Sequence, residues 1–192
     1  FVEAGSKHHK INDDFNGIDQ EGVGVYQVTQ KNGKRCSAAV AYLNPIKHRK
    51  NLTIMTDTVV DKVIIKDQRA VKVRCIRKNN NHELSANREI LLCGGAYGSP
   101  TILMRSGIGD ENFLKSKDID CLVDLKGVGE NLQDHIDYIT SHRVDSWELF
   151  GKPFKSLKFT LRAPLELIKY IFASKGMWTS NLAEGGAFIK SD

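Results

Sequence analysis

The residue types best suited to chemistry lie in a glycine-rich stretch near the middle of the chain. The apolar run 90–93 leads into a loop with three glycines between residues 94 and 98. Ser99 then stands where a helix N-cap belongs, and Pro100 follows at the first helical position. Free N–H groups and the helix dipole at such a start attract an anion, usually a dinucleotide pyrophosphate. An ordinary tight turn between a strand and a helix would show the same local pattern.

The elements expected to hold this loop are a buried strand at 90–93 and a short helix at 101–105. Gly107 is placed to end that helix in the left-handed conformation. Alternating apolar residues upstream predict strands, which turn-forming residues join into a small β-meander. The other predicted elements are strands at 22–29, 51–56, 63–65, 70–76 and 119–123, a hairpin tip at 79–82, a helix at 35–43 ending before Pro45, and a helical turn at 110–117.

Polar residues crowd into one turn between Gly127 and His135. Asp134 and His135 alone could form half of a catalytic pair, because a carboxylate can orient an imidazole. Sequence neighbours rarely face one another in that way, and we interpret His135 as a structural residue that holds its turn.

A longer amphipathic pattern runs from Leu157 to Ser174 and is interrupted by Pro164. Lysine and arginine residues occupy its other faces. Such a helix could lie on a membrane surface, or it could pack against a sheet of its own protein, which is the commoner arrangement.

Residues 95–109 read GAxxSPxILxxSGIG, which resembles the second signature of the glucose–methanol–choline (GMC) oxidoreductases. The resemblance extends over essentially the whole chain. It includes DFNG at 14–17, NLTI at 51–54 and GVGENLQDH at 127–135. The pattern SNxxE at 180–184 is similar to the choline dehydrogenase and bacterial alcohol dehydrogenase branch.

This resemblance implies FAD as the cofactor. The positions that it places against FAD are Val60, through its main chain, and Gly94, Gly95, Ala96 and Ser99 in the glycine loop. No histidine of the chain matches the family's catalytic base, so no catalytic residue is assigned. Asn181 and Glu184 match positions near the family's substrate cavity.

The activity implied is that of an FAD-dependent alcohol dehydrogenase. A primary alcohol would be oxidised by hydride transfer to flavin, and the electrons would pass to a quinone or another acceptor. The chain begins at Phe1 and lacks the family's amino-terminal GxGxxG loop, so we interpret it as an internal fragment of such an enzyme. The alternative is a truncated, inert family relic, or an interaction module without cofactor.

The expected fold class is α/β. It comprises an incomplete FAD-binding sheet of the nucleotide-binding type with a β-meander, and part of an antiparallel-sheet substrate domain. We expect a connecting, substrate-side segment at 1–45, the central part of the FAD-binding domain at 46–135 and the start of the substrate-binding domain at 136–192.

The composition restricts the classes of partner. The formal net charge is +5, but the basic residues are scattered and lack interleaved aromatics, which argues against nucleic-acid binding. The four cysteines form no CxxC pair, so no metal site is predicted and a reduced, intracellular setting is expected. We expect a cytoplasmic protein, with peripheral association with the inner membrane as an open alternative.

Overall fold

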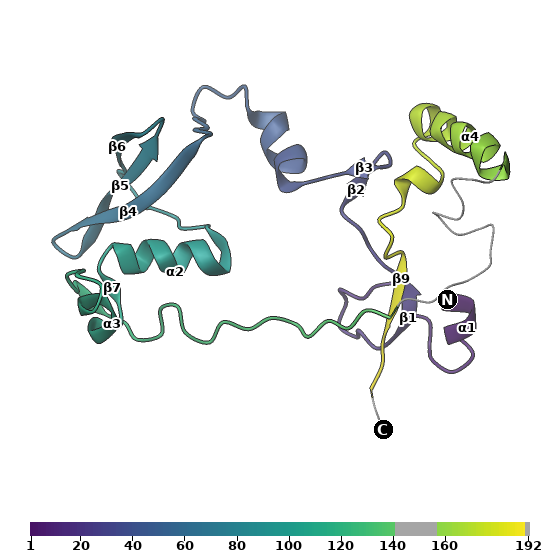
Figure 1. Ribbon diagram of the computed structural model, residues 1–192, viewed down its shortest axis with the longest axis horizontal. Coiled ribbons are helices and arrows are strands. Elements are labelled where there is room, and N and C mark those ends of the chain that lie inside the picture. Colours follow the sequence, from purple (N-terminus) through teal and green to yellow (C-terminus); the bar gives the residue numbers. More distant parts are fainter. Residues whose placement is uncertain (141–156, 191–192) are drawn as a thin grey trace. The chain divides into compact units, whose positions relative to one another are not determined.

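The computed structural model describes residues 1–140 and 157–190. The chain divides into two compact units, which are described separately (Figure 1). One unit comprises Phe1–Leu52 with Ser141–Asp192, and the other comprises Thr53–Thr140. Both contain helices and mainly antiparallel sheets, so the fold is mixed α/β. The predicted domain boundaries at 45 and 135 stay a prediction.

The second unit is built on the predicted β-meander, which the structure confirms. Strands β4 (Thr58–Lys66), β5 (Arg69–Arg77) and β6 (Asn80–Ser85) form an antiparallel sheet in that order. Asp67 and Gln68 turn the chain with φ values of 48° and 59°. Two consecutive positive φ values match the right-handed twist of the flanking strands. The second turn lies at 78–79, so the predicted hairpin tip at 79–82 falls mostly within β6.

Helix α2 (Gly95–Arg105) packs against β4 (Figure 1). Ser106, at the end of the helix, is buried, and its hydroxyl accepts the Val63 N–H at 2.8 Å and donates to the Ile102 carbonyl at 2.6 Å. Arg105 forms an ion pair with Asp61, beside an irregularity in the β4–β5 register. These contacts hold the carboxyl end of α2 on the sheet. The predicted left-handed Gly107 after the helix is confirmed, with a φ of 84°.

A short parallel pair follows, formed by β7 (Ile108–Gly109) and β8 (Val123–Asp124). Helix α3 (Glu111–Lys115) lies between them in sequence and confirms the predicted helical turn. Asp110 caps it by accepting the Phe113 N–H at 2.8 Å. The strand predicted at 119–123 is wrong in its bounds, because its first residue closes α3 by donating from the Ile119 N–H to the Leu114 carbonyl at 3.0 Å.

Two predicted strands, those at 51–56 and 90–93, are not formed among the described residues. Neither forms part of a sheet in the described part of the chain, and Leu91 is 74% exposed. A strand needs a neighbouring backbone to pair with, and the described residues offer these segments none. The predicted nucleotide-binding sheet is therefore not seen among the residues that the structure describes.

The helix predicted at 35–43 is also wrong in its bounds. Strands β2 (Gln30–Lys31) and β3 (Lys34–Arg35) form a hairpin before it. A five-residue π-helix, Ala39–Leu43, then runs into a 3₁₀ turn, Asn44–Ile46, that contains Pro45. Proline is tolerated there because the first N–H groups of a helix need no intrahelical acceptor.

The first unit centres on an antiparallel pair, β1 (Gly22–Val25) and β9 (Gly185–Phe188). Phe15 is buried against this pair, with its ring 5.2 Å from that of Phe188 and 5.6 Å from that of Tyr26. Helix α1 (Val2–Gly5) contacts β1. The strand predicted at 22–29 ends at Val25, because the chain leaves the ladder to begin the β2–β3 hairpin.

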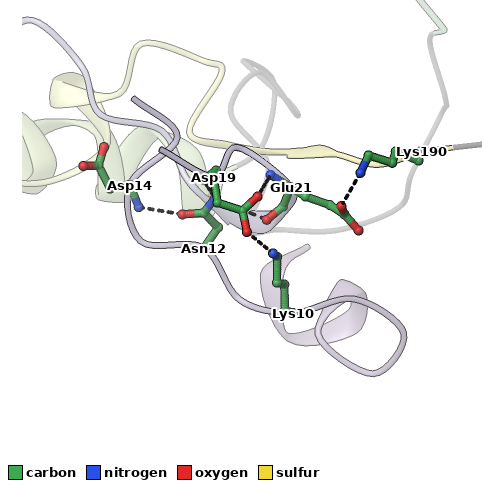
Figure 2. Close-up of polar contacts among 6 residues, drawn as sticks. All are labelled: Lys10, Asn12, Asp14, Asp19, Glu21 and Lys190. Atoms are coloured by element: carbon green, nitrogen blue, oxygen red, sulfur yellow. Dashed lines mark hydrogen bonds and ion pairs between the residues drawn. The ribbon is translucent and has the colours of Figure 1, made fainter. Parts of the chain in front are cut away.

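Polar contacts fix the loop before β1 (Figure 2). The Asn12 amide donates to the carbonyls of Asp19 at 2.8 Å and Glu21 at 3.2 Å. Lys10 forms an ion pair with Asp19, which lowers the pKa of that carboxyl. Lys190, just beyond β9, lies 3.3 Å from the carboxylate of Glu21, so an ion pair joins the start of β1 to the end of β9.

Helix α4 (Leu157–Ala173) confirms the predicted amphipathic helix, but Pro164 does not interrupt it. A proline removes one backbone donor, and the turns on either side continue the helix. The 3₁₀ turn η3 (Met177–Thr179) packs against it. No helix in the described ranges is long and apolar enough to span a membrane. The aromatic residues Trp147, Phe150 and Phe154 lie outside the described residues.

Candidate functional site

The glycine loop begins α2 earlier than the sequence predicted. Gly94 is the N-cap and the helix starts at Gly95, so Ser99 and Pro100 lie inside it. The predicted Ser99 cap and first-position Pro100 are therefore wrong. Gly95 has a φ of 76°, which only glycine adopts without strain, and this conformation brings the chain into the helix. Pro100 carries no N–H for the Ala96 carbonyl, which is a modest loss so close to the helix start.

Ser99 supports the loop from within the helix. Its hydroxyl accepts the Gly94 N–H at 2.9 Å and donates to the Leu92 carbonyl at 3.3 Å. A β-carbon at Gly94 would lie 3.0 Å from the Ser99 nitrogen and 3.1 Å from the Gly98 carbonyl carbon. The loop is thus folded tightly onto its own helix, and one hydroxyl joins its two sides.

A groove of about 780 Å³ lies between α2 and the segment 127–133. Met104 lines the groove and lies close to the facing segment, since a β-carbon at Gly129 would meet the Met104 methyl at 3.3 Å. Polar groups at Thr101, Asn131 and Gln133 line its sides. The volume falls within the range of small-molecule and cofactor sites.

Glycines in the first turn of α2 and in the groove lining leave open space beside the backbone. At Gly95, Gly98 and Gly127 an added β-carbon would have no heavy atom within 4 Å. The first turn of α2 also presents backbone N–H groups that an α-helix leaves without acceptors. The open glycine positions and these N–H groups form an electropositive surface beside a partly apolar groove. This arrangement suits an elongated anionic ligand.

The predicted site residues divide into two groups. Ala96 and Ser99 line the groove, and Gly94 and Gly95 lie at the start of the same helix. Val60 lies on β4, half-buried opposite Cys75, and is absent from the groove lining. The structure therefore brings four of the five residues into one turn and leaves Val60 apart, on the sheet that supports the other end of α2.

Sequence reasoning did not select Asn131 and Gln133 as site residues, although both line the groove. The sequence feature that could have identified them is the crowding of polar residues after Gly127 and Gly129. Nearby, the Asp134 carboxylate accepts the backbone N–H of His135 at 2.8 Å, and both residues are exposed. This contact engages the main chain of His135, which argues against a carboxylate–imidazole catalytic pair.

The described residues contain no group of three or more histidine, cysteine or acidic side chains placed to hold a metal ion. All four cysteines are free, and burial raises the pKa of the Cys121 thiol, with added repulsion from Glu111 and Asp124.

The comparisons with known proteins agree with the geometry. Residues 2–137 match the family described as GMC oxidoreductase. The alcohol dehydrogenase [acceptor] of Pseudomonas putida is 43% identical over 100% of this chain and 35% of its own length. The oxygen-dependent choline dehydrogenase of Staphylococcus haemolyticus is 41% identical over 100% of this chain and 32% of its own length.

A solved structure extends the likeness to the fold. An FAD-dependent oxidoreductase from Chaetomium thermophilum aligns with a TM-score of 0.75 and 25% identity, over 93% of this chain and 31% of that one. The chain thus spans about a third of the length of the two curated relatives, at 35% and 32%.

Proposed function

Because this chain belongs to the GMC oxidoreductase family, we propose that it forms part of the FAD site of an enzyme that oxidises an alcohol. The observation that carries the proposal is the groove beside the amino end of α2, with its open glycines and tightly folded loop. The named relatives and the FAD-dependent structural neighbour support the same activity and cofactor.

The residues present fit a dinucleotide cofactor. The N–H groups of the first turn of α2 would hold its negative charge, and Gly95 and Gly98 would let it approach the backbone. Ser99 keeps the loop in place, while Asn131 and Gln133 would bind polar edges of the cofactor from the opposite wall. Val60 is proposed as a further main-chain contact from the family resemblance alone.

When bound, FAD supplies the hydride acceptor for alcohol oxidation, so the demanding chemistry belongs to the cofactor. The described residues bind and position it. No group of this chain is assigned to proton transfer, because no histidine matches the family's catalytic base. The substrate is proposed to be a small-molecule primary alcohol, and the electron acceptor a quinone or another acceptor. We expect the enzyme to be cytoplasmic and to bind no nucleic acid.

We also propose a nucleotide-binding sheet in the full-length protein. Segment 90–93 has the apolar composition of a buried parallel strand and segment 51–56 is predicted as a strand, but neither forms a sheet in the described residues. They are proposed to be strands of a nucleotide-binding sheet whose other strands come from the rest of a longer protein. The proposed substrate domain would include the β1–β9 pair together with Asn181 and Glu184, which line a separate pocket beside that pair. The alternative of an inert family relic has no feature of the described structure in its favour.

The test is a bulky substitution in the groove of the full-length protein. Ala96→Leu places a branched side chain in the groove, whereas Ala4→Leu, on the exposed helix α1, is the matched control. We expect Ala96→Leu to lower the bound flavin, read from the visible absorbance band, by about tenfold, corresponding to about 1.4 kcal/mol of binding free energy. The control keeps its flavin. Unchanged flavin content in Ala96→Leu would show that the groove is not the cofactor site.

A further inference from the structure

The outer surface of α4 carries a stripe of exposed apolar side chains. Leu165, Ile168, Ile171 and Phe172 are 59%, 52%, 62% and 84% exposed. Spacings of three and four residues place them on one side of the helix. The inner side packs against η3, where Glu166, Tyr170 and Ser174 are buried or half-buried. We call the four exposed residues the apolar stripe.

The charges of α4 are divided unevenly between these two sides. Glu166 is the sole acidic residue between Leu157 and Ala173, and it is only 6% exposed. Its carboxylate accepts the Met177 N–H at 3.1 Å and lies 2.7 Å from the Lys169 ammonium. The acidic group is thus turned inward.

The charged groups on the exposed part of this region are all basic. Arg162 and Lys169 on α4 are exposed, as is Lys175 just after it. On a helical wheel Arg162 and Lys169 lie along one border of the apolar stripe, at about 60° and 40° from Leu165. The described surface of α4 therefore combines large apolar side chains with cations and exposes no carboxylate.

We propose that α4 lies flat on an anionic lipid bilayer, with the apolar stripe at the boundary between headgroups and acyl chains. The occupant is identified by charge complementarity, because a surface with exposed cations and no exposed acid fits anionic headgroups. A spanning role is not proposed, since no described helix could cross a membrane. Such contact would bring the enzyme to a surface where lipid-soluble alcohols and acceptors concentrate.

The competing arrangement is a stripe covered by another segment of the longer protein or by a second copy of this chain. A stripe covered by lipid and a stripe covered by protein predict different binding to vesicles, and this measurement does not depend on flavin. The experiment uses the full-length protein with vesicles of phosphatidylcholine containing phosphatidylglycerol, and with vesicles of phosphatidylcholine alone.

Sedimentation with these vesicles measures binding. We expect the unsubstituted protein to bind anionic vesicles at least tenfold more tightly than neutral ones, with binding weakened by salt. The double variant Ile168→Glu/Phe172→Glu should lose at least tenfold in affinity. The charge-matched control Ile18→Glu/Leu182→Glu, at positions 110% and 83% exposed, should bind as the unsubstituted protein does. Equal binding by both double variants, or no binding by the parent, would overturn the proposal.

A second variant keeps the test decisive if Ile168→Glu/Phe172→Glu fails to fold. Phe172→Trp retains an aromatic group and reports its surroundings by fluorescence, measured as the difference from the protein without this substitution. We expect water-exposed emission without lipid and a blue shift on addition of anionic vesicles. Emission that is already blue-shifted without lipid, or that does not respond to vesicles, would show that protein covers the stripe.

Discussion

At the scale of single residues, the loop at the start of α2 depends on hydrogen bonds from side chain to backbone. Ser99 joins the Gly94 N–H to the Leu92 carbonyl, and Ser106 joins the Val63 N–H to the Ile102 carbonyl. Ser99 therefore fixes the segment that precedes the helix, and Ser106 fixes the end of the helix on the sheet. Each hydroxyl can join a backbone N–H to a backbone carbonyl because it accepts one hydrogen bond and donates another at the same time.

Ser99→Ala tests the first of these links. Removing the hydroxyl leaves the Gly94 N–H and the Leu92 carbonyl without this partner, so we expect the free energy of unfolding to fall by about 1 kcal/mol. Chemical denaturation of the flavin-free full-length protein measures this change, and flavin titration should show weaker binding. Ser85→Ala, at an exposed position of β6, is the control and should change neither value. Equal stability of the two variants would contradict the role given to Ser99.

At the scale of elements, the carboxyl end of α4 is joined to η3 through Glu166. The hydrogen bond from Lys169, followed by that from the Met177 N–H, lowers the pKa of the Glu166 carboxyl below its ordinary value of 4.5. A lowered pKa in the folded state means that the ionised carboxylate favours folding above the ordinary value. This contribution is lost as the pH falls below 4.5 and through the lowered folded pKa.

Hydrogen exchange at the Met177 amide can follow this loss. After correction for intrinsic exchange, we expect its protection to fall as the pH drops below the ordinary carboxyl pKa of 4.5 and the carboxylate is protonated. Glu166→Gln keeps the shape of the side chain without the titratable charge. This variant should show lower protection at neutral pH and little further loss on acidification. A pH profile identical to that of the unsubstituted protein would rule out Glu166 as the titrating group.

At the scale of the whole molecule, the two segments predicted as strands at 51–56 and 90–93 form no sheet within the described part of this chain. Leu91 is 74% exposed although the run 90–93 has the composition of a buried strand. A parallel strand becomes stable only between neighbours that pair with its backbone and cover its faces. The proposed nucleotide-binding sheet would supply both in the full-length protein.

The substitution Leu91→Ala tests whether Leu91 is buried in the full-length protein although it is exposed in the isolated chain. In the full-length protein we expect the free energy of unfolding to fall by about 2–4 kcal/mol, the usual cost of removing a buried leucine side chain. In the isolated chain, an exposed position should cost no more than about 0.5 kcal/mol. Denaturant unfolding of both proteins measures the difference. A small effect in the full-length protein would show that this segment stays exposed there and is not a strand of a buried sheet.

Much of the local structure could be predicted because it depends on neighbouring residues. The β-meander, the left-handed Gly107 and the helix from Leu157 all follow from periodicity and turn chemistry. The start of α2 could not be placed in this way. Ser99 and Pro100 fit the pattern of a helix start, but glycines at 94 and 95 allow the helix to begin one turn earlier.

The sequence by itself determined the family, through a motif spread over residues 95–109, and with it the expected cofactor. It also placed four of the five predicted site residues in one stretch, because they are adjacent in the chain. Only the tertiary structure brought the segment 127–133 against α2 to form a groove, and only it left Val60 outside that groove. Pairing between distant segments depends on which backbones and side chains come into contact after folding, and local sequence patterns carry no information about those contacts.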